Sequence, residues 1–254
     1  MHVVPLPALA DNYIWLLHDD DGNAIAVDPG TAEPVERALQ QRNLQLRAIL
    51  LTHHHADHTG GVAGLLQQHR VDVYAPHDPR IALATHRVQD GEQLNLALPL
   101  ASFDVMAVPG HTLSHIAYAG EGLLLCGDTL FSLGCGRLFE GSPAQMLASL
   151  DRMATLPAQT LACPAHEYTA ANARFALSVD PHNQALQHRL AEIATQRQQN
   201  LPTLPVTLAS ELACNPFLRI DQPSVQSWCM ARGAGDDRVQ RFAALRSGKD
   251  EFRG

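Results

Sequence analysis

The sequence predicts an α/β protein, and three features of the chain indicate this class. Short apolar runs alternate with helical patterns through the first two thirds of the 254 residues. Four of the apolar runs pass directly into histidine or aspartate, and after His166 the pattern becomes predominantly helical. Alternating strands and helices are typical of layered α/β domains, in which the loops carry the chemistry. We therefore expect an α/β domain followed by a smaller helical region.

Hydrophobic periodicity places the individual elements. In the first part of the chain it predicts helices at 33–43 and 60–70 and strands at 23–30, 47–52, 72–76, 103–110, 115–120, 123–127 and 160–165. In the second part it predicts a proline-bearing linker at 201–206 and helices at 166–179, 181–200, 223–231 and 236–248. The helix at 181–200 is expected to bury one face, which carries Leu186, Leu190, Ile193 and Ala194.

Charge and cysteine content limit the class of protein. A net charge of −8, counted with neutral histidines, makes broad attraction to nucleic acid unfavourable. The first residues lack a basic segment followed by a long apolar one, and no stretch approaches the ~20 apolar residues of a membrane helix. Five widely spaced cysteines without a C-x-x-C pair are typical of reduced thiols. We expect a soluble cytoplasmic protein that binds neither nucleic acid nor membranes.

The chain contains 14 histidines, and several of them follow predicted strands. Histidine is the commonest metal ligand in proteins. The four apolar runs that end in polar residues lead into His53, His111, Asp128 and His166. Because functional side chains at strand ends converge on one edge of an open sheet, we expect these four residues to share a site.

The segment from Thr52 to His58, THHHADH, is the most informative motif. In an extended or tightly turned loop His53 and His55 point the same way, while Asp57 and His58 can turn toward a second point. Two divalent cations about 3.5–4 Å apart suit a reaction in which a bound hydroxide attacks and the developing charge is neutralised. The spacing therefore predicts a dinuclear metal site, completed by His111, Asp128 and His166.

Imidazole and carboxylate ligands suit zinc, iron or manganese, so the ligand type does not choose the metal. We expect four other histidines not to bind metal, although the last could orient a ligand: His54, His77, His86 and His115. Asp28 is either a similar acceptor for a ligand or a turn residue at a strand end. The non-enzymatic alternative is a structural metal site, which would have one closed shell of four strong ligands.

The motif T-H-H-H-A-D-H, with GHT, GDT and HEY downstream, resembles the metallo-β-lactamase superfamily, whose fold is a four-layer αββα sandwich. Within it the chain resembles the glyoxalase II, or hydroxyacylglutathione hydrolase, family from LPALADNY through CGRLFEG and NPFLR to LRSGKDEF. The resemblance implies a catalytic domain at 1–166 and a helical substrate-binding domain at 167–254. It also implies hydrolysis of S-(2-hydroxyacyl)glutathione thioesters, with S-D-lactoylglutathione giving D-lactate and glutathione in the second step of methylglyoxal detoxification.

The resemblance assigns the metal ligands as well. It implies a first metal ion at His53, His55 and His111, a second at Asp57, His58 and His166, and Asp128 as the bridge. Zinc is the first expectation for both ions, with iron or manganese as alternatives. Asp57 and Asp128 are then the catalytic residues, together with a metal-bridging hydroxide that attacks the thioester carbonyl. The departing thiol, with a pKa near ~8.5, can leave as thiolate without a general acid.

In this family glutathione is held by a basic and an aromatic residue of CG-x-x-x-EG, by the tyrosine of HEYT and by two basic residues near the C-terminus. The matching residues here are Arg137, Phe139, Tyr168, Arg246 and Lys249. Many relatives have lysine and tyrosine where this chain has Arg137 and Phe139, so the charge is kept and a hydroxyl hydrogen bond is lost. The expected partner is a small glutathione thioester, and we expect a monomer.

The nearest alternative is a glutathione persulfide dioxygenase of the same superfamily, which shares the histidine run. The helical tail that carries NPFLR and LRSGKD resembles glyoxalase II and is expected to be absent or different in the dioxygenases. A β-lactamase is normally exported, and a nuclease would favour a basic surface. These two functions are therefore less compatible with the sequence.

Overall fold

The computed structural model describes residues 1–253, which form two compact units. Unit 1 comprises Met1–Ala107, Ser114–Gly127 and Cys163–His166. Unit 2 comprises Val108–Leu113, Asp128–Ala162 and the chain from Glu167 onward. Each unit combines segments that are far apart in the sequence, and the division of the chain after residue 166 remains a prediction.

Unit 1 contains a mixed sheet with the strand order β1-β2-β3-β4-β5-β6. β1 to β3 pair antiparallel, and β3 to β6 pair parallel. The strands are β1 (His2–Ala8), β2 (Asn12–His18), β3 (Asn23–Val27), β4 (Gln45–Leu50), β5 (Asp72–Pro76) and β6 (His86–Val88). Because parallel neighbours need crossover connections, α1 (Glu33–Arg42) links β3 to β4 and α3 (Val62–Gln68) links β4 to β5.

The second sheet of unit 1 follows the order β13-β10-β9-β8-β7. Its strands are β7 (Gln93–Ala97), β8 (Leu100–Ala107), β9 (Ile116–Gly120), β10 (Leu123–Gly127) and the end of β13 (Leu161–Pro164). β7 to β10 pair antiparallel. The fully buried Tyr118 of β9 donates its hydroxyl hydrogen to the carbonyl of Leu51, directly after β4, at 3.0 Å. The two sheets therefore pack against each other.

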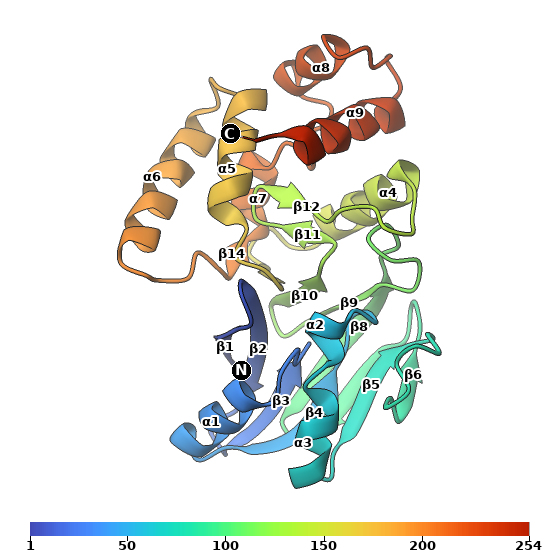
Figure 1. The fold of residues 1–254 in the computed structure, drawn as a ribbon, viewed down its shortest axis with the longest axis vertical. Coiled ribbons are helices and arrows are strands. Elements are labelled where there is room, and N and C mark those ends of the chain that lie inside the picture. The colour runs from blue at the N-terminus through green and yellow to red at the C-terminus, as the bar shows by residue number, and fades with distance from the viewer. Residues whose placement is uncertain (254) are drawn as a thin grey trace. The chain divides into compact units, whose positions relative to one another are not determined.

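The other face of the first sheet is covered by α1 and α3 (Figure 1). The buried residues in this contact include Val35, Leu39, Leu65, Ile14, Leu16 and Ile49. Each such side chain contributes about 1.5–3 kcal/mol when it leaves water. Helices on one face and a second sheet on the other explain why β3 and β4 are so apolar in sequence.

Unit 2 is predominantly helical. Its helices are α4 (Pro143–Ala154), α5 (Thr169–Val179), α6 (Gln184–Gln198), α7 (Leu208–Cys214), α8 (Pro223–Met230) and α9 (Arg238–Glu251). β11 (Leu130–Phe131) and β12 (Gly134–Cys135) form a hairpin, and β14 (Val206–Thr207) pairs with the start of β13. Across residues 1–253, no helix combines the length and the apolar composition that a membrane span requires.

The predicted fold class is confirmed, because mixed sheets with helices are followed by a helical C-terminal region. Two details differ from the prediction. The proline-bearing linker contributes Val206 to β14, and Ala194 is exposed although its helical spacing placed it on the buried face of α6. The sequence analysis did not predict β1, β2, β6, β7, β11, β12, β14, α4, α7 or the short helix α2 (Ala56–Thr59).

A buried carboxylate fixes the β11–β12 hairpin of unit 2. Glu211 of α7 accepts hydrogen bonds from the Ser132 hydroxyl and the Leu133 amide, both at 2.8 Å. Leu133 has a φ of 58°, in the left-handed region that a bulky side chain rarely adopts. The Asn215 side chain donates to Glu211 and to the Gly134 carbonyl, each at 2.9 Å. These contacts hold the hairpin turn in its unusual conformation.

Glu211→Ala should lower the free energy of unfolding by about 3 kcal/mol. The Leu133 and Asn215 donors would each be left without this buried acceptor, and each unsatisfied donor costs about 1–3 kcal/mol. Glu211→Gln should cost less, since the Ser132 hydroxyl can turn and accept from the new amide. Urea denaturation of both variants would measure this order. Glu33→Ala is the matched control, because the Glu33 side chain is 67% exposed and its partner Arg37 is exposed as well. Equal stabilities of Glu211→Ala and the control would contradict the role of Glu211 in holding the hairpin turn.

Candidate metal centre

The histidine-rich segment runs from the end of β4 into a single helical turn, α2 (Ala56–Thr59). His55 precedes the turn with an extended backbone, φ −61° and ψ 146°. His55 therefore lies in an extended stretch and His53 in a bend before it, while Asp57 and His58 lie in the helical turn. Gly30 gives the turn its space, because a Cβ at this position would lie 1.9 Å from the carbonyl oxygen of Asp57.

The side chains of this segment face one another. His53 Nε2 lies 3.0 Å from His55 Nδ1, and the ring centroids of His53 and His58 are 4.1 Å apart. His58 Nε2 lies 3.4 Å from the Asp57 carboxylate. His53 and His58 are buried, with 0% and 1% of their surface exposed. Ring nitrogens gathered beside a carboxylate, away from water, are a donor set that suits a divalent metal.

Asp28 anchors this arrangement from the end of β3. Its carboxylate accepts hydrogen bonds from the Thr52 amide at 2.8 Å and the Thr52 hydroxyl at 2.7 Å, and it lies 3.0 Å from His58 Nδ1. Asp28 itself is buried and has a φ of 51°. The sequence left Asp28 as either a turn residue or an acceptor that orients a ligand, and this geometry favours the second. Because Asp28 holds Nδ1, the ring of His58 directs Nε2 toward Asp57.

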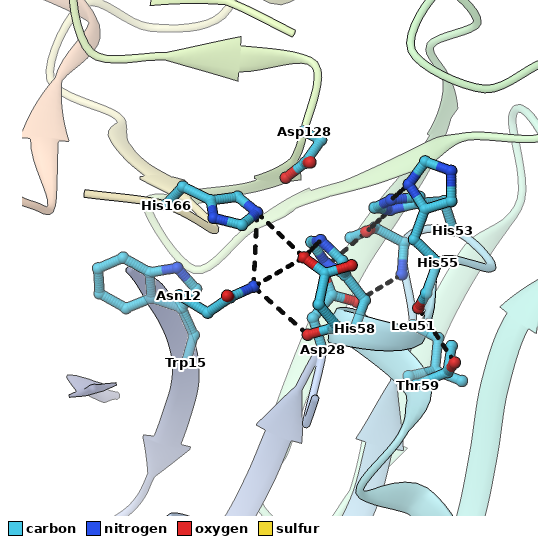
Figure 2. Close-up of polar contacts among 12 residues, drawn as sticks. Asn12, Trp15, Asp28, Leu51, His53, His55, His58, Thr59, Asp128 and His166 are labelled. Atoms are coloured by element: carbon cyan, nitrogen blue, oxygen red, sulfur yellow. Dashed lines mark hydrogen bonds and ion pairs between the residues drawn. The ribbon is translucent and has the colours of Figure 1, made fainter. Parts of the chain in front are cut away.

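His166 and the start of β2 complete the group within unit 1. Figure 2 shows Asn12 and His166 on one side of His58, and His53 and His55 on the other. His166 Nε2 lies 3.4 Å from the Asp57 carboxylate. The neighbouring rings of His166 and His58 hold the pKa of the Asp57 carboxyl well below its usual range. The carboxylate is therefore ionised, as a metal ligand must be.

Two residues in this group escaped the sequence analysis. Asp11 Oδ1 lies 2.7 Å from His166 Nδ1, and Asn12 donates to the Asp57 carboxylate at 3.0 Å. Asp11 directly precedes β2 and Asn12 is its first residue, so a rule that looks for polar residues after strands does not find them. The segment ADNY carried the only sequence signal, through its place in the family resemblance.

The strand-end interpretation needs one correction. β4 belongs to the first sheet, whereas β8, β10 and β13, which precede the other three ligands, belong to the second. The single sheet edge that we expected is therefore divided between two sheets, because the chain changes sheet between β6 and β7. Within unit 2, His111 Nε2 lies 3.4 Å from the Asp128 carboxylate, and His111 Nδ1 lies 2.9 Å from the Arg137 carbonyl.

The donors of unit 1 fit a metal. The ligand atoms of Asp57, His58 and His166 all lie within 4.8 Å of one another, and those of Asp28, His53 and His58 form a second such group. Imidazoles with carboxylates suit zinc, iron and manganese. The four histidines expected not to bind metal are in neither group; His115 stacks on His53 with centroids 4.6 Å apart.

The residues expected to contact glutathione all belong to unit 2. Arg137, Phe139 and Arg246 line one cleft of about 370 Å³, together with Leu138, Pro143, Ala243, Ser247 and Asp250. Tyr168 packs edge to face on Phe131, with centroids 5.2 Å apart. The Lys249 amine lies 5.9 Å from the Phe175 ring centroid. The structure thus brings three of the five residues to one cleft.

These basic residues differ in exposure. The Arg137 side chain is 64% exposed, whereas Arg246 is buried and donates to the Cys135 carbonyl at 2.7 Å and to Asp250 at 3.0 Å. Burial, with the positive charges of Arg246, Arg137 and Arg174, lowers the pKa of Lys249. The guanidinium groups add to the effect of burial, and positive charges gathered in this way favour an anionic ligand.

Comparisons with known proteins agree with this fold. Residues 10–108 and 105–166 match the family model "Metallo-beta-lactamase superfamily", and residues 167–252 match "Hydroxyacylglutathione hydrolase C-terminus". The hydroxyacylglutathione hydrolase of Xanthomonas euvesicatoria pv. vesicatoria is 53% identical over all of both chains. The structure of ETHE1 from Myxococcus xanthus covers 85% of this chain and 100% of its own, at 28% identity and a TM-score of 0.60. TTHA1623 in a di-iron-bound form covers 65% and 92%, at 29% identity and a TM-score of 0.55.

The two-sheet fold and the His-x-His-x-Asp-His run define a member of the metallo-β-lactamase superfamily. The identity over the full chain and the match of the C-terminal region go further. The chain belongs to the hydroxyacylglutathione hydrolase family.

Asp28→Asn should weaken both the fold and metal retention. Asparagine tolerates the left-handed backbone, but its amide cannot accept from all the donors that meet the Asp28 carboxylate. We expect a loss of about 1–3 kcal/mol in unfolding free energy and a metal affinity lower by about 10–100-fold. Urea denaturation and a chelator competition titration would measure both. Asp72→Asn is the control, because Asp72 is 55% exposed in β5; equal effects of the two substitutions would contradict the anchor role.

Proposed function

We propose that this enzyme hydrolyses S-(2-hydroxyacyl)glutathione thioesters, with S-D-lactoylglutathione as the substrate that yields D-lactate and glutathione. This is the second step of methylglyoxal detoxification. The observation that carries the proposal is the convergence of Asp57, His58 and His166 in a chain that is 53% identical, over its full length, to a hydroxyacylglutathione hydrolase. The C-terminal match at residues 167–252 supports this function over that of other superfamily members.

We infer that two metal ions are held by the ligands that the sequence implies. These are His53, His55 and His111 for the first, Asp57, His58 and His166 for the second, and Asp128 as the bridge. The donor geometry of unit 1 and the di-iron-bound form of a related structure support a dinuclear site. Zinc is the metal we propose, with iron and manganese as outcomes of a metal count. When bound, the metals would supply an acidified water and a Lewis acid for the thioester carbonyl.

The chain's own residues prepare this chemistry. Asp28 holds the ring of His58 with Nε2 directed toward Asp57. Asp57 is ionised over the whole neutral range, because its neighbouring rings lower its pKa. No side chain needs to protonate the leaving group, since a thiol with a pKa near ~8.5 departs as thiolate. The residues therefore act by holding ligands and substrate rather than by covalent attack.

Glutathione recognition is the proposed role of Arg137, Phe139, Tyr168, Arg246 and Lys249. Glutathione carries two carboxylates, and guanidinium and ammonium groups bind carboxylates through charge-assisted hydrogen bonds. Burial and then the positive charges of Arg246 and Arg137 lower the pKa of Lys249, so the two guanidinium groups lie within electrostatic reach of its amine. Phe139 is 64% exposed and offers an apolar surface without a hydroxyl group.

We also propose that the enzyme acts as a cytoplasmic monomer. Its widely spaced cysteines suit a reducing compartment, and its charge of −8 suits a protein without nucleic-acid partners. Size-exclusion chromatography with light scattering would test the monomer.

The deciding experiment is thiol release from S-D-lactoylglutathione by purified protein, before and after chelation, with a metal count. We expect fast hydrolysis that is lost on chelation, and about two metals per chain. Absence of hydrolysis by metal-replete protein would contradict the proposal. Oxygen uptake with glutathione persulfide, run in parallel, would then identify the dioxygenase alternative, and one saturated zinc would identify a structural site.

A matched pair of histidine variants separates the site from the surface. His58→Asn removes a ring from the buried donor group and should abolish the second metal and the turnover. His86→Asn alters a histidine that is 50% exposed and should leave both unchanged. Similar turnover of the two variants would argue against metal-dependent hydrolysis at this site.

The lowered pKa of Lys249 predicts a pH dependence of substrate binding. Lys249 therefore loses its proton at a lower pH than an ordinary lysine, whose pKa is about 10.4. Only the charged amine attracts a carboxylate, so KM should rise at alkaline pH while kcat changes little. Lys249→Arg should remove this rise, because arginine stays charged. The effect is measured as the ratio of the wild-type KM to the KM of Lys249→Arg, determined between about pH 7 and 10. A ratio that stays constant over this range would contradict the prediction.

A further inference from the structure

The turn between β1 and β2 places two adjacent polar side chains behind the ligands of one metal site. β1 ends at Ala8 and β2 begins at Asn12, so Asp11 is the last residue of the turn. Asn12 forms an isolated β-bridge with His166, and the Tyr13 amide donates to the Ala165 carbonyl at 2.7 Å. The backbone of this turn is thus fixed directly against the segment that carries His166.

Asp11 controls the ring of His166. Its Oδ1 lies 2.7 Å from His166 Nδ1, while His166 Nε2 lies 3.4 Å from the Asp57 carboxylate. A carboxylate that accepts from Nδ1–H fixes the tautomer in which Nε2 offers its lone pair, and it makes the ring more basic. The Asp11 side chain is 42% exposed, so burial contributes little to its role.

Asn12 controls the carboxylate of Asp57. Its side-chain nitrogen donates to Asp57 Oδ2 at 3.0 Å and lies 3.4 Å from His166 Nε2 (Figure 2). An amide has two N–H donors and no charge, so it can hold a carboxylate oxygen in place while leaving its negative charge for a metal. Asn12 is 7% exposed, which keeps water from replacing this contact.

We propose that Asp11 and Asn12 are positioning residues for the second metal, which hold His166 and Asp57 in the orientation that binds it. This inference rests on the proposed two-metal function. Neither residue needs to touch the metal or the substrate. The two adjacent side chains each hold a different ligand of the Asp57, His58 and His166 group, so their loss should weaken that group selectively.

The test is the number and affinity of Zn²⁺ ions bound by Asp11→Ala, Asp11→Asn and Asn12→Ala, measured by elemental analysis after dialysis and by chelator competition. We expect one site of wild-type affinity and one site about 10–100-fold weaker. Asp11→Asn should lie between wild type and Asp11→Ala, because asparagine keeps an acceptor without the charge. Thermal melting of the metal-free proteins would show whether the fold is preserved.

Asp20→Ala is the matched control. Asp20 contacts His2 at the same 2.7 Å, but this pair is exposed and lies outside the donor groups. It should bind two Zn²⁺ ions with wild-type affinity. Wild-type metal binding by Asp11→Ala and Asn12→Ala would overturn the positioning role but not the two-metal function. Equal weakening of both metal sites, together with a lowered melting temperature, would overturn the positioning role in the same way. Fewer than two Zn²⁺ ions on the wild-type chain would overturn the two-metal function, and this inference with it.

Discussion

The site of unit 1 depends on the carboxylate of Asp28. Holding a residue other than glycine at a φ of 51° costs of order 1–3 kcal/mol. Hydrogen bonds to a charged acceptor contribute about 1.5–3 kcal/mol each, and Asp28 meets three donors on Thr52 and His58, so the contacts outweigh the strain. One side chain thereby links the end of β3 to the start of the histidine segment and fixes the ring orientation of His58.

Local sequence pattern and tertiary contact together decide how much of the fold could be predicted. β3 and β10 are buried along their whole length, so their apolar runs identify them. β1 is an edge strand with two prolines in HVVPLPA, which weakens its strand pattern and is typical of such edges. α4 was overlooked although Ser142 and Gln145 form a capping box, a signal that the sequence does contain.

The predictability of the site has a different limit. A histidine or aspartate directly after an apolar run stands out, which is why local reasoning selected His53 and His166. Asp11 lies 155 positions from its partner His166, and Asn12 lies 45 positions from Asp57. Only the folded chain makes these pairs neighbours, so no local pattern announces them. The choice of sheet for each strand is also a tertiary property, which explains the incorrect expectation of a single sheet edge.

The C-terminal motifs show that family signatures can act on shape rather than chemistry. Asn215 of NPFLR donates to the Gly134 carbonyl, and Arg246 of LRSGKD donates to the Cys135 carbonyl, so both secure β12. Since Arg246 also donates to Asp250, its guanidinium has few donors left for a ligand. Arg246 therefore fixes the hairpin that precedes Arg137, whereas the Arg137 side chain itself is 64% exposed.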